Sequence, residues 1–517
     1  MFDRRRFLEL LAALGVSQAL PARAADRKVR FDSYPFTLGV ASGYPTPDGF
    51  VLWTRLAPKP LEPGGGLAPG PVPMLWEVAE DERFAKVVAS RAEFPTHHWA
   101  HSVHAEVEGL KPDRWYWYRF LAGDAVSPVG RTRTAPAAGA AAARLRFAFA
   151  SCQHYEHGYF TAYKHMLADD LDLVVFLGDY IYESSLRRNQ VRMHERSDEP
   201  VTLDEYRARY AQYKADKDLQ AAHHAFPWIV TWDDHEVDND YANDRQEDGA
   251  PPEEFLLRRA AAYQAYYEHM PLPASMRPSG PAMQIYTALG WGTLASFYLL
   301  DGRQYRSPHA CPRKAGGGNE VDPRECIDLR DPSRTMLGAA QEAWLDRRFA
   351  ASRASWNIVA QPVLMAQRKS KSGDRQSIWT DSWDGYPAAR KRLLESVVAR
   401  KLANPVVISG DVHMHFVADL KLDFDDDRSP VVASEFAGTS ITSSPGSWQR
   451  NMPVILTQNP HIKYGNGEHR GYVRASIAGG RFNAELVGLE TVRKPESRAQ
   501  VLARFAVEDG KAGPQKV

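Results

Sequence analysis

From residue 145 onward, the apolar stretches that resemble buried strands each stop at a pair of residues with polar or metal-binding character. The stretches are 145–150, 171–177, 228–232 and 405–409, and they lead into Ser151-Cys152, Gly178-Asp179, Asp233-Asp234 and Gly410-Asp411. A helical stretch at 159–169 lies between the first two. Strands followed by helices predict an α/β fold, in which ligands bind at the carboxyl ends of the strands. We therefore expect these four strand ends to carry the chemistry.

The chain before residue 145 has a different pattern. Residues 49–55, 74–78, 104–108 and 115–120 are short apolar or alternating stretches, and clusters of Pro and Gly separate them. Such strands with turn signals predict a small β-sandwich of the immunoglobulin or fibronectin type, which we place at 34–134. Residues 135–144 are rich in Ala and lack core-forming side chains, so we expect a linker there.

The remaining boundaries follow from the linker. We expect a catalytic domain at 145–493 and a C-terminal helix or tail at 494–517. A helix over 495–507 would place Leu502 and Phe505 on one side. Whether such a helix restricts the active-site mouth is left open by the sequence.

The composition excludes several classes of protein. The 64 Lys and Arg residues balance 64 Asp and Glu residues, so bulk charge gives no basis for nucleic-acid binding. A chain that is 44% apolar is too rich in core-forming residues to be disordered, and 3 Cys are too few for a disulfide scaffold. No segment after the N-terminus approaches transmembrane length, so we expect no stable membrane anchor, and we expect a monomer.

Residues 1–24 resemble a twin-arginine signal peptide. Arg4, Arg5 and Arg6 precede a modest apolar stretch at 7–20, and residues 22–24 read Ala-Arg-Ala, the form of a cleavage site. A membrane anchor is the alternative, but the stretch is shorter than the roughly 20 residues that span a bilayer. We therefore expect the twin-arginine machinery to export the protein to a periplasm or to the cell exterior.

Export determines how the cysteines are interpreted. Cys311 and Cys326 enclose a polar, glycine-rich loop, and in an oxidising compartment they are expected to form a disulfide, with two free thiols as the alternative. Cys152 is then unpaired, and an unpaired thiol in a secreted protein requires a reason. Its position at a strand end makes it a candidate metal ligand.

Each polar strand end also has a purely structural interpretation. Gly178-Asp179 with Tyr182 could be a turn followed by an aromatic core residue. The run 233–236, Asp-Asp-His-Glu, could cap a helix, which is the better interpretation of Glu236. The alternating Asp411, His413 and His415 could belong to an edge strand.

Taken together, the four strand ends resemble the metallophosphoesterase superfamily, and in particular the PhoD-type alkaline phosphatases. The resemblance rests on four motifs: 151–153 (Ser-Cys-Gln), 178–182 (Gly-Asp-Tyr-Ile-Tyr), 233–236 (Asp-Asp-His-Glu) and 410–413 (Gly-Asp-Val-His). The signal peptide and segments 36–43, 51–55 and 435–440 also resemble that family, whereas Tyr44 stands where the family has an acidic residue. The resemblance implies a four-layer α/β/β/α sandwich behind the β-sandwich.

The resemblance also implies two kinds of metal site. Cys152, Asp179, Tyr182 and His413 would bind Fe(III), with Asp179 bridging to a second metal. That second site would hold one or two Ca(II) ions. Its ligands would be Asp179, Asp411 and one carboxylate of the pair Asp233 and Asp234, with Asn239 assisting. Up to six negative charges suit Fe(III) with Ca(II) better than a pair of zinc ions, and carboxylate ligands favour hard cations.

The activity implied is hydrolysis of phosphate monoesters or diesters by a metal-activated water, which releases inorganic phosphate from small phosphate esters. Asp234, as a metal ligand, and His235 are the predicted catalytic residues, and His235 would bind the phosphoryl group or protonate the leaving alkoxide. Arg192 could neutralise a phosphate oxygen, with a solvated surface position as the alternative. Two other functions stay open: a phospholipase D-like phosphodiesterase that acts on phospholipids, and a phosphate- or metal-binding module without turnover.

Overall fold

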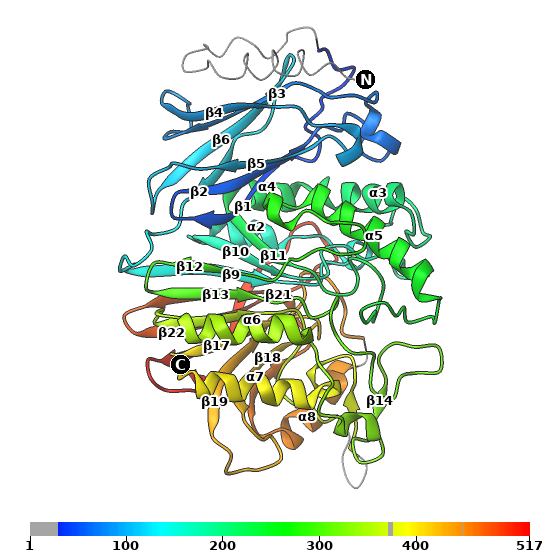
Figure 1. Ribbon diagram of the computed structural model, residues 1–517, viewed down its shortest axis with the longest axis vertical. Coiled ribbons are helices and arrows are strands. Elements are labelled where there is room, and N and C mark those ends of the chain that lie inside the picture. Colours follow the sequence, from blue (N-terminus) through cyan, green and yellow to red (C-terminus); the bar gives the residue numbers. More distant parts are fainter. Residues whose placement is uncertain (1–28, 371–375, 447) are drawn as a thin grey trace, which may run out of the picture.

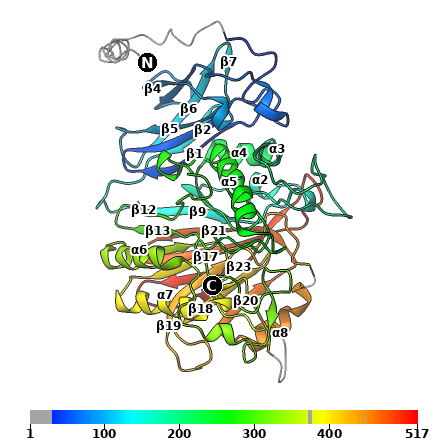
Figure 2. The same ribbon diagram turned by 45° about the vertical axis from the view of Figure 1, so that its right-hand side comes forward.

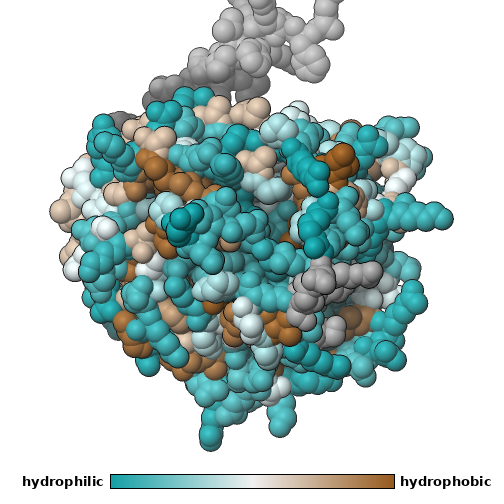
Figure 3. Space-filling model, turned by 90° about the horizontal axis from the view of Figure 1, so that it is seen from below, coloured by the Kyte–Doolittle hydropathy of each residue, from teal (hydrophilic) through white to brown (hydrophobic). Residues whose placement is uncertain are grey.

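A computed structural model describes residues 29–370, 376–446 and 448–517 of the protein. The predicted signal peptide at 1–24 lies outside these residues. None of the helices that the structure describes is both long and apolar enough to cross a bilayer. On the face shown in Figure 3, hydrophobic residues occur in small groups between hydrophilic ones.

Two large sheets form the centre of the molecule (Figure 1). The first has ten strands in the order β24-β23-β22-β21-β9-β10-β11-β1-β2-β5. Their bounds are β24 (Gln515–Lys516), β23 (Ala499–Glu508), β22 (Arg481–Leu489), β21 (Arg470–Ala478), β9 (Arg144–Ala150), β10 (Leu173–Leu177), β11 (Pro227–Thr231), β1 (Val40–Thr46), β2 (Gly49–Arg55) and β5 (Ser102–Val107). Strands β9, β10 and β11 are parallel neighbours, so their carboxyl ends lie side by side.

The second sheet has seven strands in the order β12-β13-β15-β17-β19-β18-β20. They are β12 (Thr287–Trp291), β13 (Ala295–Leu299), β15 (Trp356–Ala360), β17 (Pro405–Ser409), β19 (Val431–Ala437), β18 (His415–Lys421) and β20 (Ile462–Asn466). Aromatic rings from the two sheets touch: Phe147 of β9 lies 5.3 Å from Phe297 of β13, between ring centroids, and Phe436 of β19 lies 5.4 Å from Phe482 of β22. The sheets therefore pack face to face around an aromatic core.

Helices cover both outer faces of this pair of sheets. Figure 1 shows one group beside the ten-stranded sheet: α2 (Ala162–Ala168), α3 (Leu203–Lys214), α4 (Lys217–Ala225) and α5 (Pro252–His269). The other group lies beside the seven-stranded sheet: α6 (Gly338–Ala351), α7 (Pro387–Ala399) and α8 (Met452–Gln458). All five residues of β10, and likewise of β11, are buried, as expected of strands covered on both faces. The predicted four-layer α/β/β/α sandwich is confirmed.

The N-terminal part forms the predicted β-sandwich. Its outer sheet contains β4 (Val87–Glu93), β3 (Met74–Ala79), β6 (Trp115–Ala122), β7 (Ala125–Val126) and β8 (Gly130–Arg133). Apolar side chains of β3 and β6 pack against those of β1, β2 and β5, and Figure 2 shows this layer beyond the helices. Because β1 pairs in parallel with β11, the sandwich shares a continuous sheet with the rest of the chain. A small separate sheet joins β14 (Glu320–Val321) to β16 (Ile378–Trp379).

The prediction of a C-terminal helix is wrong. Residues 499–508 form β23, which pairs along its length with β22, and residues 515–516 form β24 at the edge of the sheet. Leu502 and Phe505 suggested one side of a helix, but the segment from Val501 to Val507 equally fits a strand whose buried face includes Ala503, Phe505 and Val507. Pairing with β22 selects the two-residue repeat of a strand over the 3.6-residue repeat of a helix.

Candidate metal centre at the strand ends

The four predicted strand ends converge where the two sheets meet. Cys152, Asp179 and Asp233 follow the neighbouring strands β9, β10 and β11, and Asp411 follows β17 of the other sheet. A side chain at Gly178 could not fit, because a Cβ atom there would lie 2.6 Å from the backbone nitrogen of Asp233. A Cβ atom at Gly410 would collide with the hydroxyl of Ser151. The glycines before Asp179 and Asp411 therefore permit the close approach of these loops.

Four of the predicted ligands have unusual backbone conformations. The φ angles are 60° at Cys152, 58° at Asp179, 62° at Asp411 and 54° at His413, all in the left-handed region. This region is uncommon for residues other than glycine and costs of order 1 kcal/mol or more per residue. Such conformations are found where the surroundings dictate a side-chain direction. They also exclude the edge-strand interpretation of Asp411 and His413, since the extended strand β18 begins only at His415.

Cys152, Asp179 and His413 form the first cluster. Each offers a ligand atom, and these atoms lie within 4.8 Å of one another. The hydroxyl of Tyr182 is 2.7 Å from Oδ2 of Asp179 and 3.0 Å from Nε2 of His413. The structure thus brings together all four residues predicted to bind iron.

His413 is oriented for ligation. Its Nδ1 lies 3.0 Å from the carbonyl oxygen of Ser444. A carbonyl oxygen only accepts, so Nδ1 carries the proton and Nε2 presents its lone pair towards Tyr182 and Asp179. An imidazole fixed in this way by a backbone carbonyl is the usual arrangement of a metal-binding histidine.

Among the predicted metal ligands that the structure describes, two buried carboxylate oxygens have no hydrogen-bond donor: Oδ1 of Asp179 and Oδ2 of Asp233. Burial raises the pKa of Asp179 well above its usual range. Burial likewise raises the pKa of the Cys152 thiol, and the charge of Asp179 adds to this. Anions that lack donors and solvent require a cation to remain charged. The donor set therefore fits a bound metal.

Asp234 joins two further clusters. Its carboxylate groups with Asp179 and His235, and separately with Asp240 and Asp381, in each case with ligand atoms within 4.8 Å of one another. One oxygen accepts the backbone N–H of His235 and the other that of Asp240, at 3.0 and 2.7 Å. Asp234 therefore bridges the first cluster to a purely acidic one.

The other predicted calcium ligands lie nearby. Asp411 is half-buried, and burial together with the charge of Asp233 raises its pKa well above the usual range. Asn239 donates its backbone N–H to Glu183 and its side-chain N–H to Glu247, at 3.1 and 2.7 Å. Its position beside Glu183 is thus fixed by hydrogen bonds.

Arg303 is a fully buried cation at this centre that the sequence did not reveal. Its Nε donates to Oδ1 of Asp233, and its two terminal nitrogens donate to the carboxylate of Asp381 at 2.7 and 2.9 Å. Asp381 also accepts from Arg306 and contacts His309. Arg303 thus partly neutralises Asp233, and one of its terminal nitrogens lies 3.6 Å from Oδ2 of Asp234.

His235 is paired with Glu183. Nδ1 of His235 lies 2.7 Å from Oε2 of Glu183, and its ring packs 4.1 Å from that of Tyr182, between centroids. Burial alone would lower the pKa of His235, but the negative charges of Glu183, Asp234 and Asp179 outweigh burial and raise this pKa well above its usual value. The three carboxylates therefore favour the protonated form of this imidazole.

Glu236 has a different role from the one predicted. No helix begins at this position. Its carboxylate instead accepts the backbone N–H groups of Asp179, Tyr180 and Asp233, at 3.1, 2.6 and 2.9 Å. Glu236 thereby ties the loop after β10 to the loop after β11 and fixes the spacing of two predicted ligands.

Arg192 is engaged by neighbours other than the clustered ligands. Its guanidinium donates to Asp216 at 2.6 Å and to the carbonyl of Tyr155 at 3.2 Å, and it stacks over the ring of Tyr155. Through these contacts, Arg192 links η3 (Tyr155–His157) to Asp216, the residue that caps the start of α4. The side chain is largely buried, which does not match the solvated surface position, whereas the phosphate-binding role stays a prediction.

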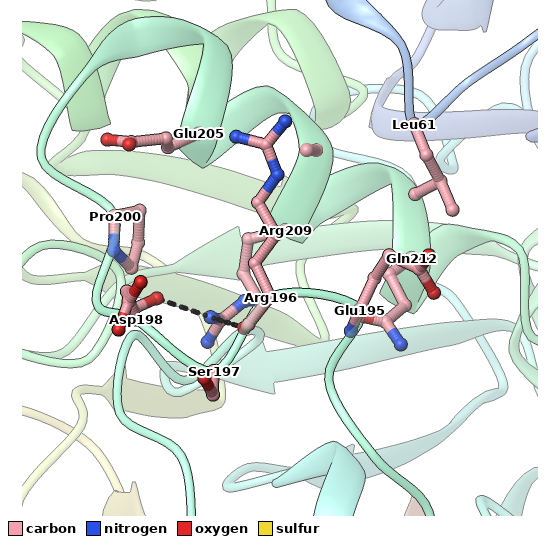
Figure 4. A pocket seen from close by; sticks show the side chains of 10 residues that line it. Leu61, Glu195, Arg196, Ser197, Asp198, Pro200, Glu205, Arg209 and Gln212 are labelled. Carbon is pink, nitrogen blue, oxygen red and sulfur yellow. Dashed lines mark hydrogen bonds between the residues drawn. The ribbon is translucent and has the colours of Figure 1, made fainter.

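Behind this centre lies a cavity of about 290 Å³ (Figure 4). It is lined by the loop 195–200, by residues of α3 and by Leu61 of the β-sandwich, and it includes none of the predicted metal ligands. Arg209 on its wall donates to the carbonyl oxygens of Tyr182 and Glu183, so this residue supports the centre from outside.

Cys311 and Cys326 form a disulfide in the structure. The bridged loop reaches the acidic cluster, since Arg313 and the N–H of Gly318 both donate to Oδ2 of Asp240, at 2.6 and 3.0 Å. The bridge therefore fixes a loop that covers the Asp234, Asp240 and Asp381 group. Cys152 is the one free cysteine in the sequence, and it is buried at the centre.

Comparisons with known proteins agree with this geometry. The family model for the PhoD-like phosphatase matches residues 147–486, and that for the PhoD-like phosphatase N-terminal domain matches residues 21–136. Alkaline phosphatase D of Bacillus subtilis (strain 168) is 46% identical over 530 aligned positions, which cover 100% of this chain and 89% of that protein. A solved structure of PhoD superposes with a TM-score of 0.89 at 47% identity, covering 95% of this chain and 93% of that one. The chain therefore belongs to the PhoD-like phosphatase family.

Proposed function

We propose that this protein is a metal-dependent phosphoesterase that hydrolyses small phosphate monoesters, with release of inorganic phosphate, or small phosphate diesters, with release of an alcohol and a monoester. The observation that carries the proposal is the convergence of Cys152, Asp179, Tyr182 and His413, with a buried carboxylate oxygen of Asp179 that has no donor in the described part of the chain. The relationship to alkaline phosphatase D supports the same activity.

The donor chemistry supports Fe(III) and Ca(II). Thiolate, phenolate, carboxylate and imidazole from Cys152, Tyr182, Asp179 and His413 would hold the ferric ion. Asp179, Asp234 and Asp411 would hold one or two calcium ions, with Asn239 nearby and Asp233 acting mainly through Arg303. Zinc fits this oxygen-rich second site less well.

The chain's own groups complete the reaction. Bound cations would supply Lewis-acid activation of water and charge neutralisation at the phosphate. His235, protonated through Glu183, is placed to donate a proton to the oxygen of the departing alcohol. Glu236 holds the two ligand loops at a fixed spacing, so the predicted ligands need no reorganisation to bind metal and substrate.

Elemental analysis and turnover on the same purified sample test this proposal. We expect iron and calcium to copurify, hydrolysis of a chromogenic phosphate ester, and loss of activity on chelation. Zinc alone, without iron, would refute the metal assignment. If the metal-loaded protein hydrolyses none of the phosphate esters, the proposed enzymatic activity is refuted. A monoester, a diester with the same leaving group and a phospholipid, assayed side by side, separate the small-ester activity from a lipid-directed one.

Export is part of the proposal. The Cys311–Cys326 bridge and the twin-arginine motif at 4–6 together support a periplasmic or secreted enzyme delivered by the twin-arginine machinery, and we expect it to be a monomer. Replacing Arg4, Arg5 and Arg6 by Lys is expected to retain the chain in the cytoplasm. Normal export of that variant would overturn this assignment.

A further inference from the structure

A second polar pocket adjoins the metal centre. It has a volume of about 610 Å³ and is lined by the loop at 186–189, by Thr442 and Ser444, and by residues around the start of β21 and the end of β22. Four arginines contribute to its wall: Arg187, Arg188, Arg470 and Arg493. Two carboxylates, Glu468 and Glu490, are exposed at the same pocket. Cationic groups therefore outnumber anionic ones there.

Arg470 is the unusual member of this group. The residue is 9% exposed, and its guanidinium donates only to carbonyl oxygens among the described residues, those of Ser443 at 3.2 Å and Gly467 at 2.6 Å. Its Nε is buried and has no partner in the described part of the chain. Burial lowers the pKa of Arg470 to about 10, so the guanidinium is charged at neutral pH, and none of its hydrogen-bond partners is a carboxylate that would offset this charge.

His157 adds a second unsatisfied group to the pocket wall. Its Nδ1 is buried and lacks a partner within the described ranges. Burial, reinforced by Arg470 and Arg493, lowers the pKa of His157 to about 4, so the ring is neutral at ordinary pH and can offer a hydrogen bond. The pocket wall thus contains a buried guanidinium that has no carboxylate partner and a buried ring nitrogen that has no hydrogen-bond partner among the described residues.

The pocket and the metal centre share one wall. Ser443, whose carbonyl accepts from Arg470, donates its own hydroxyl to the Tyr182 oxygen at 2.8 Å. Ser444, which lines the pocket, accepts from His413. A phosphate at the predicted ligands and an anion at Arg470 would therefore lie on either side of residues 443–444.

We propose that the pocket of Arg187, Arg188, Arg470 and Arg493 binds a second phosphate group carried by the alcohol portion of the substrate. The preferred substrates are then phosphate esters whose leaving group bears another phosphate. Buried Arg470 fixes that phosphate, and the exposed arginines contribute charge at the entrance. This inference rests on the proposed phosphoesterase activity and adds a specificity to it.

A matched pair of substrates tests the inference: 1,3-propanediol bisphosphate and 1,3-propanediol monophosphate, with release of inorganic phosphate as the readout. We expect kcat/KM to be about tenfold higher for the bisphosphate, after correction for its two equivalent esters. This is the size of effect expected when a substrate gains one charge-assisted hydrogen bond. Arg493→Gln and Arg187→Gln, both at exposed positions, should lower kcat/KM for the bisphosphate more than for the monophosphate. Arg470→Lys should do the same if it folds.

The control is Arg428→Gln, an exposed arginine on the turn between β18 and β19 that lies outside this pocket. It should leave the ratio of the two kcat/KM values unchanged. Equal kcat/KM values in the unaltered enzyme overturn the inference. So does an equal loss for both substrates in the pocket variants, since the arginines would then serve the reacting phosphate.

Calorimetric binding of the same two compounds to the metal-loaded protein separates this inference from the proposed function. If neither compound is hydrolysed, the phosphoesterase proposal fails. Tighter binding of the bisphosphate that weakens in Arg493→Gln would still support the second phosphate site. Equal binding of the two compounds would overturn it.

Discussion

Oε2 of Glu183 lies 2.7 Å from Nδ1 of His235, although 52 positions separate the two residues in the chain. Glu183 also accepts the backbone N–H of Asn239, so its carboxylate is fixed from two sides. The pairing orients the imidazole of His235, with Nδ1 donating to Glu183 and Nε2 left for the substrate.

Removing His235 should abolish most of the activity. We expect His235→Asn to lower kcat by roughly 10²- to 10⁴-fold, the usual contribution of a positioned proton donor. Steady-state kinetics on a chromogenic monoester measures this loss. The iron content should stay near that of the unaltered enzyme, because His235 is not among the proposed iron ligands. A variant with full activity would contradict the proton-donor role.

Glu183→Gln should change the pH dependence. Glu183 is among the charges that raise the pKa of His235, so a donor His235 stays protonated to higher pH than usual, and activity falls as pH rises through that pKa. Without the carboxylate, the alkaline limb of the kcat/KM profile should move to lower pH. The control is Glu247→Gln, which alters the partner of Asn239 instead. An unmoved alkaline limb would show that another group governs it.

Tyr182→Phe should remove a visible absorption band. A phenolate bound to Fe(III) gives charge transfer in the visible range, and the phenyl ring of the variant cannot. Tyr180→Phe is the matched control, because Tyr180 is equally buried but its hydroxyl contacts His223 at 2.8 Å instead of Asp179. The band should survive in that control. A band that persists in Tyr182→Phe would exclude Tyr182 as an iron ligand.

Arg303→Met should destabilise the fold. The substitution leaves the buried carboxylates of Asp233 and Asp381 without their shared cation. Breaking a buried ion pair from one side typically costs about 3–5 kcal/mol in the free energy of unfolding. Urea unfolding measures the change, and the exposed Arg428→Met should stay within roughly 0.5 kcal/mol. Equal stability of the two variants would indicate that other groups neutralise these carboxylates.

Cys311→Ser should lower the free energy of unfolding by about 3 kcal/mol, since the bridge closes a loop with a sequence separation of 15 residues. A reducing agent should destabilise the unaltered protein by a similar amount and leave Cys311→Ser unaffected. Because the bridged loop covers Asp234, the proposed calcium site at Asp179, Asp234 and Asp411 should also lose calcium more readily, which a calcium titration would detect. If the reducing agent affects both proteins equally, the disulfide is not the source of the stability.

The sequence predicted the parts of this molecule that have a local signal. Apolar stretches that stop at Cys152, Asp179, Asp233 and Asp411 identified the strands β9, β10, β11 and β17, and their parallel arrangement explains why the residues after them converge. The pairing of Cys311 with Cys326 followed from composition and compartment.

The contributions that the sequence did not reveal come from residues whose partners are distant in the chain. Arg303 lies 70 positions from Asp233, and nothing in its neighbourhood marks it as a buried cation. Glu236 looked like a helix-capping residue, because the three backbone N–H groups that it accepts become neighbours only after folding. The segment 499–508 fitted a helix or a strand, and only the presence of β22 decided between them.

The parallel pairing of β1 with β11 has a consequence for how this protein can be divided. Ser42 and Gly43 pair with Pro227 and Trp228, and the Tyr44 hydroxyl donates to the carbonyl of Val230 at 2.8 Å. A fragment that begins at residue 145 would keep every predicted metal ligand and yet expose the full flank of β11. Bare strand flanks associate with other chains. By covering β11, the β-sandwich prevents this association, and we expect a fragment that lacks it to aggregate.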